Sequence, residues 1–240
     1  MSSSKPKPSP PKPFDRAGVA DYERRRYRGL DQRIVDHQER RLLRRAFIRL
    51  RALDPDAWVA PRGPLVLDAP CGYGRFTKLI LGEGARLVSC DLARPMVERA
   101  LEGRDRAHHL GGAVADLRGG LPFKDGAFAC VFSLRLFHHL HASEDRRAVL
   151  REFARVASAG AILSFYRFRG LHALQRRLRR FFKPRRRDIR MLTAETFARE
   201  AAEAGLIVER IFPLFRGIHA QHIVVLKKGP CPARAVNVKT

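Results

Sequence analysis

The stretch VLDAPCGYGRF, residues 66–76, decides the fold. A short apolar run ends in an acid, Asp68, and two glycines follow at Gly72 and Gly74 before the apolar sequence resumes. This pattern predicts a β-strand that turns into a helix, and glycines at such a turn let the backbone approach a ligand because they carry no Cβ. In a doubly wound sheet this turn lies at the carboxyl edge, where ligands bind. The stretch therefore predicts a nucleotide-like ligand, although the dinucleotide fingerprint GxGxxG is absent.

Short apolar strands alternate with helical segments along the following sequence. We expect strands at 64–70, 85–91, 111–117, 128–134, 161–166, 206–212 and 222–228. Helical patterns occupy most of the gaps, which predicts a parallel sheet with helices on both faces. The last two strands leave no room for a helix between them and should pair antiparallel. The expected fold is an α/β, doubly wound, Rossmann-like, mostly parallel seven-stranded sheet with a final antiparallel strand.

Capping residues predict where the helices begin and end. Pro95 lies near the start of helix 94–103, and Gly82 or Gly84 closes the helix that follows the first strand. Ser143 is expected as the N-cap of helix 143–160, with Gly160 as its stop. A further capped helix is expected at 193–205.

The regions flanking this domain differ in composition. Residues 1–14 form a Pro/Lys/Ser tail, which we expect to be disordered. Residues 15–62 form a basic N-terminal helical cap, which ends where the three prolines of DPDAWVAPRGP break the helix. The α/β domain spans 63–228, with a basic insertion at 167–190, and 229–240 is a tail. The apolar stripe of the cap comprises Leu30, Ile34, Leu42, Phe47, Leu50 and Leu53.

The composition argues against a membrane-spanning, a secreted and a metal-binding protein. The 240 residues contain no apolar run long enough to span a membrane, and the N-terminus lacks the apolar core of a secretory signal. The four cysteines lack CxxC spacing, which predicts reduced thiols, no metal site and a cytoplasmic protein. They are Cys71, Cys90, Cys130 and Cys231.

The net charge of +24 is concentrated on the flanks of the domain. Residues 63–165 are nearly balanced at +3, whereas residues 1–62 carry +8 and residues 166–240 carry +13. Such a field attracts phosphates, anionic lipid surfaces or nucleic acid. Arginine supplies 39 of the 48 basic residues, so genome base composition is an alternative source of this charge.

Acids follow the first three strands. Asp91 ends the second strand 19 residues after Gly72, where it could accept hydrogen bonds from ribose hydroxyls. Asp116 ends the third strand, within expected reach of an adenine amino group. Together with Asp68, these acids predict an adenosine-containing ligand.

These motifs, LDAPCGYGRF, SCDLARPMVERA and VADLRGGLPFKDGAFACVFSLRLFHHL with the late strand pair, resemble a class I S-adenosylmethionine-dependent methyltransferase. Across roughly residues 63–228 the chain is most similar to the small-molecule group that includes the ubiquinone/menaquinone-biosynthesis methyltransferases. Pro70 stands where the first glycine of the family motif usually lies. The resemblance implies S-adenosylmethionine as the cofactor.

The resemblance also implies roles for individual residues. Asp68 and the turn Cys71, Gly72, Tyr73 and Gly74 would hold the methionine part of the cofactor, and Asp91 would bind its ribose. The remaining expected contacts are Leu92 and Met96 beside adenine, Asp116 and Leu117 at the adenine edge, and Ser133 beneath the sulfonium.

Histidines follow the fourth strand, where this fold meets its acceptor. His138 is our first candidate for a catalytic base and His139 the second, because an imidazole titrates near neutrality. Packing is the alternative role for both. Arg135 could hold an anionic acceptor group or lie in solvent.

The insertion at 167–190 mixes basic and aromatic residues. It could be a solvated charge run, a lid for an anionic acceptor, or a segment that docks on an anionic membrane or RNA. The sequence SLRLFHHL replaces the Asn/Asp-Pro-Pro-aromatic turn of nucleic-acid amino methylation. We therefore expect methyl transfer to a small or lipid-linked acceptor, with an anionic acceptor as one variant, in the cytoplasm or peripherally at a membrane. The alternatives are an RNA methyltransferase and a non-catalytic basic RNA- or membrane-binding protein.

Overall fold

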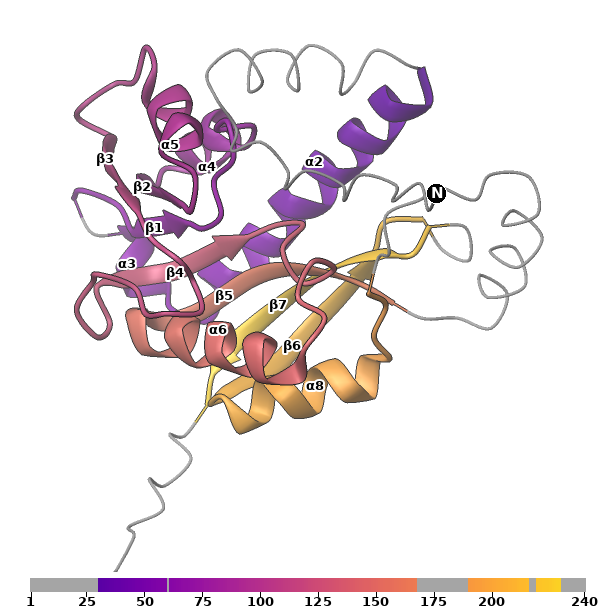
Figure 1. Cartoon of the computed structure of the whole chain (residues 1–240). Coiled ribbons are helices and arrows are strands. Elements are labelled where there is room, and N and C mark those ends of the chain that lie inside the picture. The colour runs from indigo at the N-terminus through magenta and orange to yellow at the C-terminus, as the bar shows by residue number, and fades with distance from the viewer. Residues whose placement is uncertain (1–29, 60, 168–189, 216–218, 230–240) are drawn as a thin grey trace, which may run out of the picture.

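The computed structural model describes residues 30–59, 61–167, 190–215 and 219–229. Its centre is a seven-stranded sheet in the order β3-β2-β1-β4-β5-β7-β6 (Figure 1). Strands β1 to β5 pair in parallel, and β7 runs antiparallel between β5 and β6. This confirms the expected fold. The strands are β1 (Leu65–Asp68), β2 (Arg86–Asp91), β3 (His109–Val114), β4 (Phe128–Ser133), β5 (Ala157–Tyr166), β6 (Leu206–Pro213) and β7 (Gln221–Lys228).

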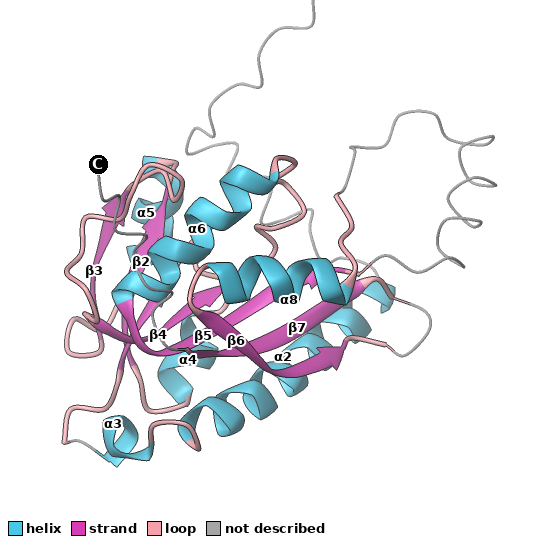
Figure 2. Cartoon of the chain, turned by 90° about the horizontal axis from the view of Figure 1, so that it is seen from below, coloured by secondary structure: helices cyan, strands magenta, loops and turns pink. Residues whose placement is uncertain are grey.

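Helices cover both faces of the sheet, with α2 and α4 on one side and α6 and α8 on the other (Figure 2). On the first side, Phe47 of α2 packs in one buried cluster with Phe132 of β4 and Val225 of β7. On the second side, Phe153 of α6 and Phe197 of α8 belong to another cluster. The helices are α2 (Leu30–Arg51), α3 (Pro55–Val59), α4 (Thr77–Gly82), α5 (Arg94–Leu101), α6 (Ser143–Val156) and α8 (Ala194–Glu203).

The direction of chain progression across the sheet reverses at β1. From β1 the chain moves outward through β2 to β3, and it then returns to β4 on the other side of β1. In open α/β sheets the loops at such a switch point leave a crevice at the carboxyl ends of the strands. The fold therefore places the turn after Asp68 beside the turns that follow β2 and β4.

Ser143 is not the N-cap of α6, so that prediction was wrong. The N-cap is Ala142, which makes no side-chain capping bond, and Ser143 Oγ donates to Glu144 Oε1 at 3.3 Å instead. Thr193, by contrast, caps α8, since its Oγ1 accepts the Thr196 N–H at 3.0 Å.

Gly160 is not the stop of α6 either. The helix ends at Val156 and β5 begins directly at Ala157, so Gly160 lies inside the strand, opposite Lys227 of β7. A Cβ on Gly160 would lie 2.0 Å from the Leu226 carbonyl oxygen. The glycine therefore serves the close approach of β5 and β7.

The N-terminal helix also differs from its predicted stripe. Leu42, Phe47 and Leu50 are buried, whereas Ile34 is 60% exposed. The helix extends past the sheet at its N-terminal end, and most of its buried apolar side chains lie in its C-terminal half (Figure 1). The proline-rich break that follows contains the short helix α3, which the sequence analysis did not predict. Of the described helices, none is long and apolar enough to cross a bilayer.

Candidate cofactor and active site

The β1–α4 turn is built on two glycines with left-handed backbone. Gly72 has φ +52° and Gly74 has φ +79°. A Cβ on Gly74 would lie 3.0 Å from Ala100 Cα, so this glycine lets the turn pack on α5. A Cβ on Gly72 would meet nothing within 4 Å, so this glycine faces open space. The backbone at Gly72 is therefore accessible, and its contact with the cofactor stays a prediction.

Asp91 joins the β1 turn to the end of β2. Its Oδ2 accepts the Gly72 N–H at 2.9 Å, and its Oδ1 accepts the Ala93 N–H at 3.0 Å. Burial raises the pKa of this carboxyl, although the backbone hydrogen bonds oppose the rise. Because two N–H groups hold the carboxylate, its position is fixed before any ligand binds.

Asp68 is a buried carboxyl at the end of β1. It is 2% exposed, and its Oδ2 has no hydrogen-bond partner among the described residues. Burial, with a smaller contribution from the charge of Asp91, raises its pKa well above the usual range. A buried acid with an unmatched acceptor fits a cationic ligand group, which the methionine part of S-adenosylmethionine carries as its ammonium.

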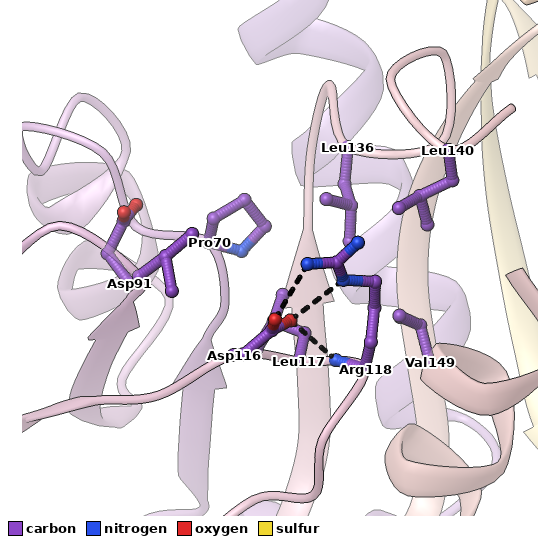
Figure 3. A pocket seen from close by; sticks show the side chains of 9 residues that line it. Pro70, Asp91, Asp116, Leu117, Arg118, Leu136, Leu140 and Val149 are labelled. Atoms are coloured by element: carbon purple, nitrogen blue, oxygen red, sulfur yellow. Dashed lines mark hydrogen bonds and ion pairs between the residues drawn. The ribbon is translucent and has the colours of Figure 1, made fainter. Parts of the chain in front are cut away.

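A pocket of about 190 Å³ opens beside this turn (Figure 3). It brings together four predicted cofactor residues: Asp91, Leu92, Asp116 and Leu117. Leu92 is 64% exposed, which leaves its apolar side chain accessible to a flat ring. The complete lining is Pro70, Asp91, Leu92, Asp116, Leu117, Arg118, Leu136, Leu140 and Val149. The site residues fit an adenosine moiety, with carboxylates from two strand ends and an apolar wall.

Arg118 also lines this pocket, and the sequence analysis missed it. Its side chain turns back toward Asp116 and donates from Nε at 3.1 Å and from Nη2 at 2.8 Å (Figure 3). These bonds lower the pKa of Asp116. The sequence did carry a signal for Arg118, because this basic residue lies two positions after Asp116, a candidate ligand acid.

The other predicted cofactor residues lie outside the lining of this pocket. Met96 is buried in α5, and Ser133 is buried at the end of β4, next in sequence to Phe132, the β4 residue in register with Asp68. Tyr73 is part of the β1 turn. Cys71 is buried there, and burial raises the pKa of its thiol, which favours the neutral thiol. The cofactor roles of these residues remain predictions.

The turn after β4 carries the candidate bases. His138 is buried, and its ring centroid lies 3.9 Å from that of His139 and 4.7 Å from that of Tyr166 at the end of β5. His139 is exposed. The main chain of this turn is also held, since the His138 carbonyl accepts the Arg190 N–H at 3.1 Å. The structure thus brings both histidines to the ends of β4 and β5, and their role in proton transfer stays a prediction.

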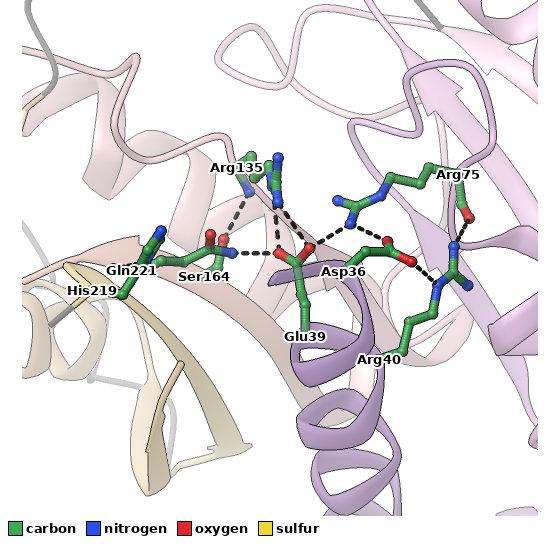
Figure 4. Close-up of polar contacts among 8 residues, drawn as sticks. All are labelled: Asp36, Glu39, Arg40, Arg75, Arg135, Ser164, His219 and Gln221. Carbon is green, nitrogen blue, oxygen red and sulfur yellow. Dashed lines mark hydrogen bonds and ion pairs between the residues drawn. The ribbon is translucent and has the colours of Figure 1, made fainter. Parts of the chain in front are cut away.

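A buried ionic network connects α2 to the β1–α4 turn and to the turn after β4 (Figure 4). Glu39 accepts from Arg135 Nη2 at 2.8 Å and from Gln221 Nε2 at 2.5 Å, and it pairs with Arg75. Arg135 has φ +62°, and its N–H donates to Ser164 Oγ at 2.8 Å. Arg135 is therefore not a solvated side chain. The sequence analysis missed Glu39 and Gln221, because they are 182 residues apart and no local pattern joins them.

Two further predictions concern charge and metals. The insertion at 167–190 lies outside the described residues apart from its first and last positions. Among the described residues, no group of three or more His, Cys, Asp or Glu side chains could hold a metal ion. The described cysteines, Cys71, Cys90 and Cys130, are free thiols.

Comparisons with known proteins find similarity to methyltransferases. A family described as a methyltransferase domain matches residues 67–165. The probable tRNA methyltransferase 9B of Mus musculus is 33% identical over 121 residues, which are 50% of this chain and 24% of that protein. The demethylmenaquinone methyltransferase of Beutenbergia cavernae is 36% identical over 126 residues, which are 51% of this chain and 48% of that protein. The chain thus spans about a quarter to about half of the length of these curated relatives.

A solved structure shares the fold over most of the chain. Magnesium protoporphyrin IX methyltransferase from Synechocystis PCC 6803, with bound SAH, superposes with a TM-score of 0.69 at 19% identity. The match covers 90% of this chain and 97% of that protein. The glycine turn, the strand-end acids and the family match lead to one assignment: residues 67–165 are a methyltransferase domain of the class I S-adenosylmethionine-dependent type, and S-adenosylmethionine is the cofactor of that domain.

Proposed function

We propose that this protein transfers the methyl group of S-adenosylmethionine to a small or lipid-linked acceptor that carries an anionic group. The observation that carries the proposal is the turn at 135–140. Leu136 and Leu140 of this turn line the cofactor pocket, whereas His138 packs against Tyr166. One short segment thus borders the cofactor pocket and carries the side chains that we assign to the acceptor.

The cofactor supplies a methyl group already activated on a sulfonium, so the protein has mainly to align the acceptor. In this proposal Arg135, tied to Glu39 and Ser164, contributes positive charge beside the acceptor. His138 takes a proton where the acceptor atom must lose one. An acceptor that is already ionised, such as a carboxylate, needs no base, and His138 then positions the acceptor by ring contact alone.

RNA is the second candidate acceptor. Two observations favour it: the net charge of +24, and the similarity to proteins named as tRNA methyltransferases. A basic surface contacts phosphates without regard to sequence. Against RNA stands the turn SLRLFHHL, which lacks the Asn/Asp-Pro-Pro-aromatic sequence of amino methylation. We also propose a cytoplasmic location, with peripheral attachment to anionic membranes as the variant that the basic segments support.

A transfer assay decides between the acceptor classes. The purified full chain is incubated with methyl-labelled S-adenosylmethionine and, separately, with metabolite, lipid and RNA fractions. The expected result is label in the metabolite or lipid fraction, absent with the Asp91→Ala variant. Label in RNA alone would contradict the proposed acceptor class while leaving the methyltransferase assignment intact.

A further inference from the structure

Arg118 and Asp116 form a closed hydrogen-bonded unit in the wall of the cofactor pocket (Figure 3). Asp116 Oδ1 accepts both the Arg118 N–H at 3.0 Å and Arg118 Nε at 3.1 Å. Among the described residues, Asp116 Oδ2 accepts from Arg118 Nη2 alone, at 2.8 Å. The two oxygens of this carboxylate are therefore used unequally.

The unequal use limits what Asp116 can still bind. A carboxylate oxygen offers about two lone-pair sites. Arg118 fills both sites of Oδ1 and one site of Oδ2, which leaves Oδ2 with one acceptor position. A single acceptor position matches a single donor, such as one N–H of an exocyclic amino group, and it opposes a carbonyl oxygen at the same place.

The guanidinium is itself held in place from a second side. Arg118 Nη1 lies 3.9 Å from Asp145 Oδ2 on α6, so the cation lies between two carboxylates. The side chains of Arg118 and Asp116 are 50% and 39% exposed, and exposed ion pairs contribute little to fold stability. Exposed ion pairs that line a ligand pocket can therefore be changed without unfolding the protein.

We propose that Arg118 is a positioning residue for adenine recognition: it fills Oδ1 and orients Asp116 so that Oδ2 accepts the adenine amino group. This inference rests on the proposed placement of the cofactor's adenine at Asp116. It assigns adenine specificity to a pair of residues rather than to the acid alone.

The experiment uses two probes that differ at that amino group and at the neighbouring ring nitrogen N1, which carries a hydrogen only in the second probe. S-adenosylhomocysteine carries the amino group, and S-inosylhomocysteine has a carbonyl in its place. Calorimetry is carried out on the wild type, Arg118→Ala, Asp116→Ala and the double variant. We expect Arg118→Ala to weaken S-adenosylhomocysteine binding about 3- to 10-fold, which corresponds to the free energy of one hydrogen bond. Its S-inosylhomocysteine affinity should stay unchanged. The double variant should match Asp116→Ala alone, because Arg118 acts through Asp116.

The matched control is Arg151→Ala, which removes an exposed arginine of α6 outside the pocket lining and should change neither affinity. The inference is overturned if Arg118→Ala binds S-adenosylhomocysteine as well as or better than the wild type, or loses both ligands equally. If Asp116→Ala itself keeps the preference for adenine, the placement of adenine at Asp116 is wrong. If Asp116→Ala loses the preference and Arg118→Ala keeps it, the placement stands and only the role of Arg118 fails.

Discussion

The Glu39 carboxylate on α2 accepts a hydrogen bond from Arg135 Nη2 at 2.8 Å, although the two residues are 96 positions apart (Figure 4). The same carboxylate oxygen lies 2.7 Å from Arg75 Nη2. Arg75 directly follows Gly74 of the cofactor turn, and Arg135 begins the turn that carries His138. One buried acid of the N-terminal helix therefore holds both turns of the site.

Replacing this acid should affect stability and cofactor binding together. Burial alone would raise the pKa of Glu39, but Arg135 and Arg75 outweigh it and lower the pKa, so the group is ionised at neutral pH. Glu39→Gln removes the carboxylate that pairs with both Arg135 and Arg75, whereas Asp36 still pairs with Arg75. Breaking a buried ion pair costs about 3 kcal/mol. Urea unfolding should show this loss. Calorimetry below the unfolding transition should show weaker S-adenosylhomocysteine binding.

The control for Glu39→Gln is Glu152→Gln. Glu152 pairs with Arg155 on α6 and accepts the Leu121 N–H at 2.7 Å, and none of these residues lines the cofactor pocket. This variant should lose some stability and keep the wild-type affinity for S-adenosylhomocysteine. Equal affinities in both variants would show that Glu39 supports the fold without supporting the site.

The ligand-free protein should be less stable with the Asp68 carboxyl than with the side-chain amide of the Asp68→Asn variant. Burial raises its pKa above the unfolded value, so the unfolded state binds fewer protons in that interval and stability falls as pH rises from the ordinary carboxyl range through the raised pKa. Asp68→Asn removes this loss. Its Tm should exceed that of the wild type near neutral pH, where about 1 kcal/mol corresponds to 2–4 °C for a chain of this length.

The pH dependence separates this explanation from a general packing effect. The Tm difference between Asp68→Asn and the wild type should be largest at about pH 8. It should shrink as the pH falls below about 4, where the Asp68 carboxyl becomes protonated in the unfolded state as well as in the folded state. The variant should also bind S-adenosylmethionine more weakly, since it lacks the anionic partner for the ligand's ammonium. A Tm difference that is constant with pH would contradict the raised pKa.

Asp91 should be needed for tight cofactor binding. Asp91→Ala removes the charged acceptor proposed for the ribose hydroxyls, a loss of about 1.5–3 kcal/mol, and it also frees the N–H groups of Gly72 and Ala93. Calorimetry should show S-adenosylmethionine affinity reduced at least 10-fold. Asp105→Ala removes an exposed acid paired with His108 and should bind normally. Unchanged affinity in Asp91→Ala would remove this residue from the site.

The sequence predicted the parts of this fold that depend on local patterns. The succession of strands along the chain, the glycine turn and the acids Asp91 and Asp116 follow from hydrophobic alternation and spacing, and the structure places both acids in one pocket. Helix ends were less predictable, because Gly160 belongs to a strand whose neighbour, β7, is more than 60 residues away. Glu39 could not be predicted for the same reason: its partners lie in two distant turns and on β7, and a buried charge has no sequence periodicity of its own.

His138 should affect transfer without affecting the cofactor. Its ring lies against Tyr166 and His139 rather than in the lining of the cofactor pocket. If His138 is a general base, His138→Ala should lower turnover about 10²-fold with the acceptor found by the fraction assay, while S-adenosylhomocysteine affinity stays at the wild-type value. The acidic limb of the pH–rate profile should disappear in the variant, because that limb reports protonation of the base.

His139→Ala is the comparison, since His139 is the exposed neighbour and the second candidate. Turnover within a few-fold of wild type in His138→Ala, with the acidic limb retained, would leave this histidine a packing residue and direct the search for a base to His139.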